Sequence, residues 1–140
     1  MDENGSASSE LSYRQAIEDA LRLLDGDWVV AVLIALAAGP LHNSDLVAAI
    51  NAVEERVGRR IHKVPLSRQV LAPTLTWMVD AGLVIRTVDP TPHPSVWYRL
   101  TPTARSLVSA LRPLAEWAQG YRTQHPAPRW RRRSTGARGA

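Results

Sequence analysis

The chain has 140 residues, 45% of them hydrophobic, and a formal net charge of +4. This length suits one domain with a single core and is short for two. The sequence has no run of about 18 apolar residues and no leader-like start, so we expect neither a membrane span nor a signal peptide, and a cytoplasmic location. Cysteine is absent, which excludes disulfides, thiolate metal sites and thiol-based sensing.

The charges are distributed unevenly along the chain. Residues 1–51 hold eight acidic and two basic residues, whereas residues 52–121 hold nine basic and five acidic residues. Residues 122–140 add six arginines and no acidic residue. A basic middle segment can meet phosphates while the acidic part faces elsewhere, so the pattern favours a nucleic-acid partner.

Apolar spacing predicts three helices in the first half of the chain. The first spans residues 11–24, and its apolar face holds Tyr13, Ile17, Leu21 and Leu24. The second, apolar nearly all round, begins at about Asp27, which can cap it, stops at Gly39-Pro40, and is expected to be the most buried element. The third is capped by Asn43 or Ser44 and ends at Gly58, and its apolar face holds Leu46, Ile50, Val53 and Val57.

A fourth helix follows the basic connector "RRIHKVP". Ser67 is a suitable N-cap, and the helix runs to about Asp80 before Ala81-Gly82. Its predicted inward stripe consists of Val70, Leu71, Leu75 and Met78. Pro73 lacks a backbone donor and presses on the preceding turn, so we expect a kink or an irregular first turn.

The sequence of the second half of the domain predicts a hairpin and a last helix. Residues 83–88 and 95–100 are rich in β-branched and aromatic residues and are separated by the proline-stiffened "DPTPHP". Thr101 or Thr103 caps the last helix, which carries Leu107, Leu111, Leu114 and Trp117 on one side. Residues 1–10 and 122–140 are expected to be disordered, the latter as a basic tail, with the domain between them.

The predicted order of elements is that of a winged helix-turn-helix domain: mainly α, with a small β-hairpin and added helices at both ends. Three blocks resemble the corresponding blocks of HxlR-type transcriptional regulators, within the MarR-like superfamily. They are "GDWVVAVLIALAAGPLHNSDL", "LSRQVLAPTLTWMVDAGLVIR" and "HPSVWYRLTPTARSLVSALRPLAEW". The sequence departs from the family at Leu41-His42, Trp97 and Ala104, and its connector before Ser67 is longer than the family's turn.

The resemblance implies a homodimer built from the first and last helices, with two recognition helices in successive major grooves of a pseudo-palindromic operator. The sequence agrees, because an apolar-faced helix at each end of a short domain has little to pack on within one chain. The family also includes regulators that respond to small molecules, so an effector is a further partner that the resemblance allows.

The helix that starts at Ser67 carries the main candidate DNA contacts. Arg68 and Gln69 can make paired hydrogen bonds to guanine and adenine edges, respectively. Ala72 or Thr76 can meet a thymine methyl group, and Ser67 can face a phosphate. The alternative for Arg68 and Gln69 is a solvent-exposed position with no contact to DNA.

Further basic residues are candidates for contacts to the DNA backbone. Arg86 on the first hairpin strand and His93 at the hairpin tip can touch phosphate or the minor groove, and Arg99 is expected to point the same way. In the connector the candidates are Arg59, Arg60 and Lys63.

The remaining aromatic and titratable residues favour no other function. Trp28, Trp97 and Trp117 are interpreted as core or dimer packing, and Trp77 lies at the edge of the buried stripe. The four histidines show no paired spacing, and no phosphate loop or nucleophile motif is present, so we expect no metal, no cofactor and no enzyme activity.

Two functions therefore remain from the sequence. The first is a sequence-specific DNA-binding regulator, which we expect to act as a repressor and as a homodimer. The second is a winged-helix protein-interaction module whose DNA helix is disabled by Pro73 and the long connector.

Overall fold

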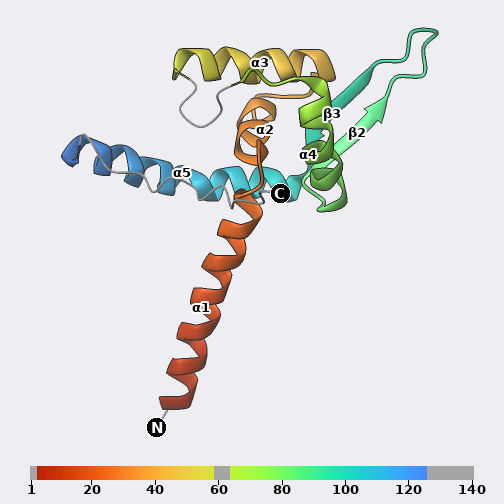
Figure 1. Cartoon of the computed structure of the whole chain (residues 1–140). Coiled ribbons are helices and arrows are strands. Elements are labelled where there is room, and N and C mark those ends of the chain that lie inside the picture. Colours follow the sequence, from red (N-terminus) through yellow and green to blue (C-terminus); the bar gives the residue numbers. More distant parts are fainter. Residues whose placement is uncertain (1–2, 59–63, 126–140) are drawn as a thin grey trace, which may run out of the picture. The chain divides into compact units, whose positions relative to one another are not determined.

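The computed structural model describes residues 3–58 and 64–125. The elements occur in the order α1 (Glu3–Leu24), α2 (Val29–Leu36), β1 (Leu41–His42), α3 (Asn43–Arg56), α4 (Arg68–Asp80), β2 (Val84–Val88), β3 (Val96–Leu100) and α5 (Pro102–Gln124) (Figure 1). The chain forms two compact units, Met1–Val108 and Ser109–Ala140, whose boundary falls inside α5.

Three helices and a small sheet build the core of the first unit. Helix α3 contacts α2 and α4, and strands β2 and β3 contact α4 and α2, respectively. The largest fully buried side chains are Leu33, Leu46, Leu71, Met78, Val29 and Val32. Since these come from α2, α3 and α4, the centre of the core lies among these three helices, and Val84, Tyr98 and Leu100 of the sheet add to it. The predicted winged helix-turn-helix fold is confirmed.

The sheet has three antiparallel strands in the order β1-β3-β2. The predicted hairpin corresponds to β2 and β3, which project beyond α4 in Figure 1. Strand β1, in which His42 is paired with Trp97, was not predicted from the sequence. The rings of these two residues lie 3.5 Å apart between centroids. A strand of two residues is too short to show the alternation of apolar and polar residues that predicts a strand, so β1 is defined by its pairing alone.

Helix α1 is longer than the apolar spacing predicted. It begins at Glu3 instead of residue 11, so it covers most of the segment that we expected to be disordered. Once a helix is nucleated, each further residue adds one backbone hydrogen bond, which lets the amphipathic part propagate into the Ser-rich start. The Arg14 Nε donates to Glu18 Oε1 at 2.8 Å, an exposed pair one helical turn apart.

The predicted caps of α2 and α3 are wrong. The N-cap of α2 is Trp28 and not Asp27. Trp28 adopts φ 71°, in the left-handed region that residues other than glycine rarely adopt. The N-cap of α3 is His42 and not Asn43 or Ser44, because pairing in β1 keeps His42 extended up to the start of the helix. Neither cap residue accepts a hydrogen bond through its side chain.

The burial of α2 and α3 matches the prediction only in part. The buried residues of these two helices are Val29, Val32, Leu33, Leu36, Leu46 and Ile50. Val30 and Ile34 of α2 are exposed, and so are Val53 and Val57 at the end of α3. Helix α2 is therefore covered on one side, and the predicted apolar face of α3 reaches the core only in its first half.

Helix α5 is capped by Thr101, one of the two predicted candidates. The Thr101 Oγ1 accepts a hydrogen bond from the Ala104 amide at 3.1 Å and donates one to the Gly82 carbonyl at 2.7 Å. Pro102 occupies the first helical position, where its missing N–H costs nothing. The cap therefore also joins the start of α5 to the end of α4.

The tryptophans fall into different environments. Trp28 is 8% exposed and belongs to the core, as predicted, whereas Trp97 is half-buried. Trp117 is exposed and stacks on Tyr121, one turn later in α5, with ring centroids 5.3 Å apart. Its predicted packing in the core is wrong, and its packing in a dimer stays a prediction.

Candidate nucleic-acid interface

The N-terminus of α4 is formed by Ser67. The Ser67 Oγ accepts a hydrogen bond from the Val70 amide at 3.2 Å, which confirms the predicted cap. The Leu71 amide donates to the Ser67 carbonyl at 3.1 Å, and α4 runs without a break to Asp80. The irregular first turn, one of the two alternatives predicted for Pro73, is therefore not found. The other backbone amides of the first turn of α4, together with the helix dipole, make this end of the helix favourable for an anion.

The inner side of α4 consists of Leu71, Leu75 and Met78, which are buried as predicted. Val70 is 55% exposed, so its place in the inward stripe is wrong. One residue of an α-helix turns the side chain by about 100°, which moves Val70 off the line that Leu71 and Leu75 follow.

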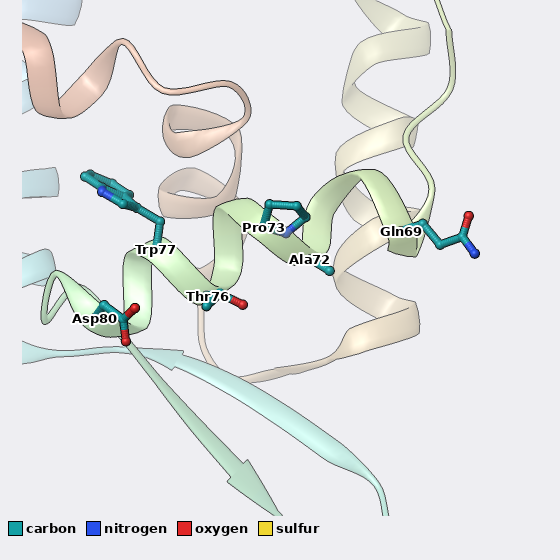
Figure 2. Close-up of a pocket in the computed structure, with 6 residues that line it drawn as sticks. All are labelled: Gln69, Ala72, Pro73, Thr76, Trp77 and Asp80. Carbon is teal, nitrogen blue, oxygen red and sulfur yellow. The ribbon is translucent and has the colours of Figure 1, made fainter.

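A shallow groove runs along the outer side of α4. Its six lining residues are Gln69, Ala72, Pro73, Thr76, Trp77 and Asp80. They form two rows with a spacing of four residues, and Figure 2 shows Pro73 and Trp77 on one side of the helix and Ala72, Thr76 and Asp80 on another. All six side chains are exposed. Three of the predicted contact residues, Gln69, Ala72 and Thr76, therefore lie together on one accessible surface.

The C-terminus of α4 has a well-defined exit. The Leu83 amide donates to the Met78 carbonyl at 2.9 Å, and the Gly82 amide donates to the Val79 carbonyl at 3.1 Å. Gly82 has φ 74°, as the Schellman arrangement requires. This confirms the exit predicted at Ala81-Gly82 and directs the chain into β2.

Two side-chain contacts that the sequence analysis missed hold α4 in place. The Asn51 side chain of α3 makes hydrogen bonds to both backbone groups of Leu66. The Thr74 hydroxyl donates to the Asp27 carbonyl at 2.8 Å. Both contacts join residues far apart in the sequence, so no local pattern could have revealed them.

The hairpin of β2 and β3, here called the wing, carries two basic side chains on different faces. The register pairs Arg86 with Tyr98 and Ile85 with Arg99. Opposed residues share a face and successive residues alternate, so Arg86 and Arg99 lie on opposite faces of the sheet. The expectation that Arg99 points the same way as Arg86 is therefore wrong.

The other predicted contact residues are placed as follows. Arg68 is exposed at the first position of α4, and Arg86 and His93 are exposed on the wing. The Thr91 hydroxyl donates to the His93 carbonyl at 2.9 Å within the wing loop. Arg59, Arg60 and Lys63 lie outside the described residues. Within the described ranges, no helix is both long and apolar enough to cross a membrane.

The fold and the exposed face of α4 define a winged helix-turn-helix protein, and comparisons with known proteins agree. The model of the HxlR-like helix-turn-helix family matches residues 56–126. An uncharacterized HTH-type transcriptional regulator from Methanothermobacter thermautotrophicus is 30% identical over 118 residues, which cover 84% of this chain and 80% of the relative.

Two solved structures support the same fold. A transcriptional regulator of the MarR family from Enterococcus faecalis V583 has a TM-score of 0.66 and 26% identity, over 81% of this chain and 91% of that chain. The transcriptional regulator ytfH from Salmonella typhimurium has a TM-score of 0.53 and 26% identity, over 76% of this chain and 84% of that chain. The chain belongs to the HxlR-like helix-turn-helix family and is a transcriptional regulator.

Proposed function

We propose that this regulator is a sequence-specific repressor that binds a pseudo-palindromic DNA operator as a homodimer. The observation that carries the proposal is the outer face of α4, where Gln69, Ala72 and Thr76 are exposed behind a capped N-terminus. A helix of this kind enters the major groove and reads bases with residues near its start.

The base contacts follow from side-chain chemistry. Arg68 can donate two hydrogen bonds to guanine, and Gln69 can pair with the N6 and N7 groups of adenine. Ala72 and Thr76 lie one and two turns further along the exposed face, where an apolar group can meet a thymine methyl. Ser67 and the free amides at the start of α4 suit a phosphate.

The wing and the connector supply contacts that position the protein without reading bases. Arg86 and His93 are exposed on the hairpin, which projects beyond α4 in Figure 1. Arg59, Arg60 and Lys63 precede α4 in the sequence and add positive charge. Contacts to phosphate from such residues strengthen binding to every DNA sequence.

The proposed homodimer is supported by the exposed apolar side chains of the two terminal helices. In α1 they are Leu11, Tyr13, Ile17 and Leu21, and in α5 they are Leu114, Trp117 and Tyr121. Exposure of aromatic and aliphatic side chains to water is unfavourable, and burial against a partner chain would lower the free energy. A two-fold dimer would present two copies of α4 to an inverted repeat. A small-molecule effector stays a prediction.

The second candidate function is a protein-interaction module. Trp77 is 44% exposed in the groove beside Pro73, and an exposed aromatic side chain can anchor a partner protein. The sequence argument that Pro73 disables α4 is weaker than expected, since the helix is continuous. The exposed Gln69, Ala72 and Thr76 therefore favour DNA binding as the first proposal.

Selection from a pool of random DNA duplexes separates the two functions. The full chain is incubated with the pool, bound duplexes are recovered over several rounds, and their sequences are compared. We expect enrichment of an inverted repeat with half-sites about 10 base pairs apart. A pool that stays random, at low salt as well, would reject specific DNA binding and favour the interaction module.

A further inference from the structure

The Asn51 side chain of α3 is hydrogen-bonded to the residue that directly precedes the cap of α4. The Asn51 Nδ2 donates to the Leu66 carbonyl at 3.0 Å, and the Leu66 amide donates to the Asn51 Oδ1 at 2.8 Å. The amide thus satisfies both backbone groups of Leu66, as a neighbouring strand would. Leu66 itself is 4% exposed.

The position of Leu66 gives this contact its importance. Leu66 directly precedes the cap Ser67, which is followed by the exposed Arg68 and Gln69. Any shift of Leu66 therefore moves the first turn of α4, where the proposed base contacts begin. Ser67 caps α4 from within the same turn, so it cannot by itself fix this turn relative to α3.

We infer that Asn51 is a positioning residue for DNA reading, which fixes the first turn of α4 relative to α3 and so places Arg68 and Gln69 for base contact. The inference rests on the proposed function. It also bears on the connector before α4. With Leu66 held by Asn51, the length of chain between α3 and Leu66 need not alter where α4 begins.

Two variants of Asn51 test this role. Asn51→Leu keeps the branched shape of the side chain, although it is bulkier, and removes both hydrogen bonds. Asn51→Asp has nearly the size of Asn and keeps the acceptor for the Leu66 amide but loses the donor to the Leu66 carbonyl. Gln15→Leu and Gln15→Glu are the matched controls, because Gln15 is an exposed amide of α1. Binding to the selected operator and to random duplex is measured for each protein.

We expect the ratio of operator to random binding to fall about tenfold in Asn51→Leu, the size of one lost bidentate base contact, and by less in Asn51→Asp. Binding to random duplex depends on phosphate contacts and should stay within about twofold of wild type. A general loss of folded protein would lower both affinities by the same factor. An unchanged ratio in both variants, with or without a lower melting temperature, would overturn the inference.

Hydrogen exchange on the wild-type chain gives a second test that needs no variant. The Leu66 amide should be protected from exchange, because its hydrogen bond to Asn51 is part-buried. Exchange at the rate of an open chain would overturn the inference. If the wild-type chain selects no DNA sequence at all, the proposed function fails, whereas selection by both wild type and Asn51→Leu with equal ratios rejects only the role of Asn51.

Discussion

Asp80 is the acidic residue among the six that line the groove on α4. It lies at the end of the row that contains Ala72 and Thr76, as Figure 2 shows. A carboxylate repels DNA phosphates, and it also lies at the negative end of the helix dipole. The N-terminal half of α4 is therefore the half that suits DNA.

Removing this charge should strengthen DNA binding. We expect Asp80→Asn to raise the affinity for operator and for random duplex together, by about two- to fivefold at low salt, because it removes a repulsion that salt screens. The gain should shrink as salt is added. Asp19→Asn in α1 is the control for a lost negative charge, and titration by fluorescence anisotropy provides the measurement. Equal gains in the two variants, or a loss in Asp80→Asn, would contradict this interpretation.

At the scale of single residues, the sequence predicted those roles that depend on neighbours in the chain. Ser67 caps α4 through the Val70 amide, and Gly82 ends it with a positive φ. Both follow from local backbone geometry. The contacts of Asn51 and Thr74 join residues 15 and 47 positions apart. An Asn or Thr within a helix looks the same in sequence whether it faces water or another segment.

At the scale of elements, the predicted helices and hairpin were found, but their ends and smallest members were not. Strand β1 has two residues and exists only through its pairing with β3. That pairing also moved the cap of α3 to His42. Apolar spacing predicts long amphipathic segments, whereas a short edge strand depends on a partner that is distant in sequence.

Pro73 gives a prediction for α4. The helix is continuous through Pro73, which has no N–H to donate to the carbonyl four residues earlier, a loss that costs about 3 kcal/mol in a regular helix interior. Pro73→Ala restores the donor. It also raises the conformational entropy of the unfolded chain, which lowers the free energy of unfolding by about 0.4 to 1 kcal/mol. We expect the free energy of unfolding to rise by about 2 kcal/mol in urea denaturation.

Pro102→Ala is the matched control for this prediction. Pro102 is the first residue of α5, where the backbone N–H has no partner within the helix. The same substitution should therefore bring no gain in the free energy of unfolding. A lower stability in Pro73→Ala, or equal changes in both variants, would show that Pro73 does not strain α4.

At the scale of the whole molecule, the exposed apolar residues of α1 lead to a prediction about assembly. We expect the wild-type chain to sediment at twice its 15.4 kDa mass. Leu21→Glu keeps a good helix former but places a charge on the apolar face, so it should weaken the dimer by at least about tenfold. Gln15→Glu adds the same charge on the same helix and should leave the dimer intact. A monomeric wild-type chain, or equal behaviour of the two variants, would contradict the proposed interface.

The order of elements and the fold class followed from the sequence because each long segment carries its own apolar pattern. The extent of α1 did not follow, because its Ser-rich start has no such pattern and becomes helical as a continuation of the segment after it. A partner chain is indicated in the sequence only by apolar helix faces, such as that of α1, which the single chain leaves exposed.

The central claim is that the first turn of α4 reads DNA bases, and the most direct test is the affinity of Arg68→Ala for the selected operator and for random duplex. Arg22→Ala removes the same charge from α1 and serves as the control. We predict that Arg68→Ala loses about 1 to 3 kcal/mol of binding free energy on the operator, with a much smaller loss on random duplex, while Arg22→Ala binds like wild type. Equal losses on both kinds of DNA would show that Arg68 contacts phosphate only and would contradict the claim.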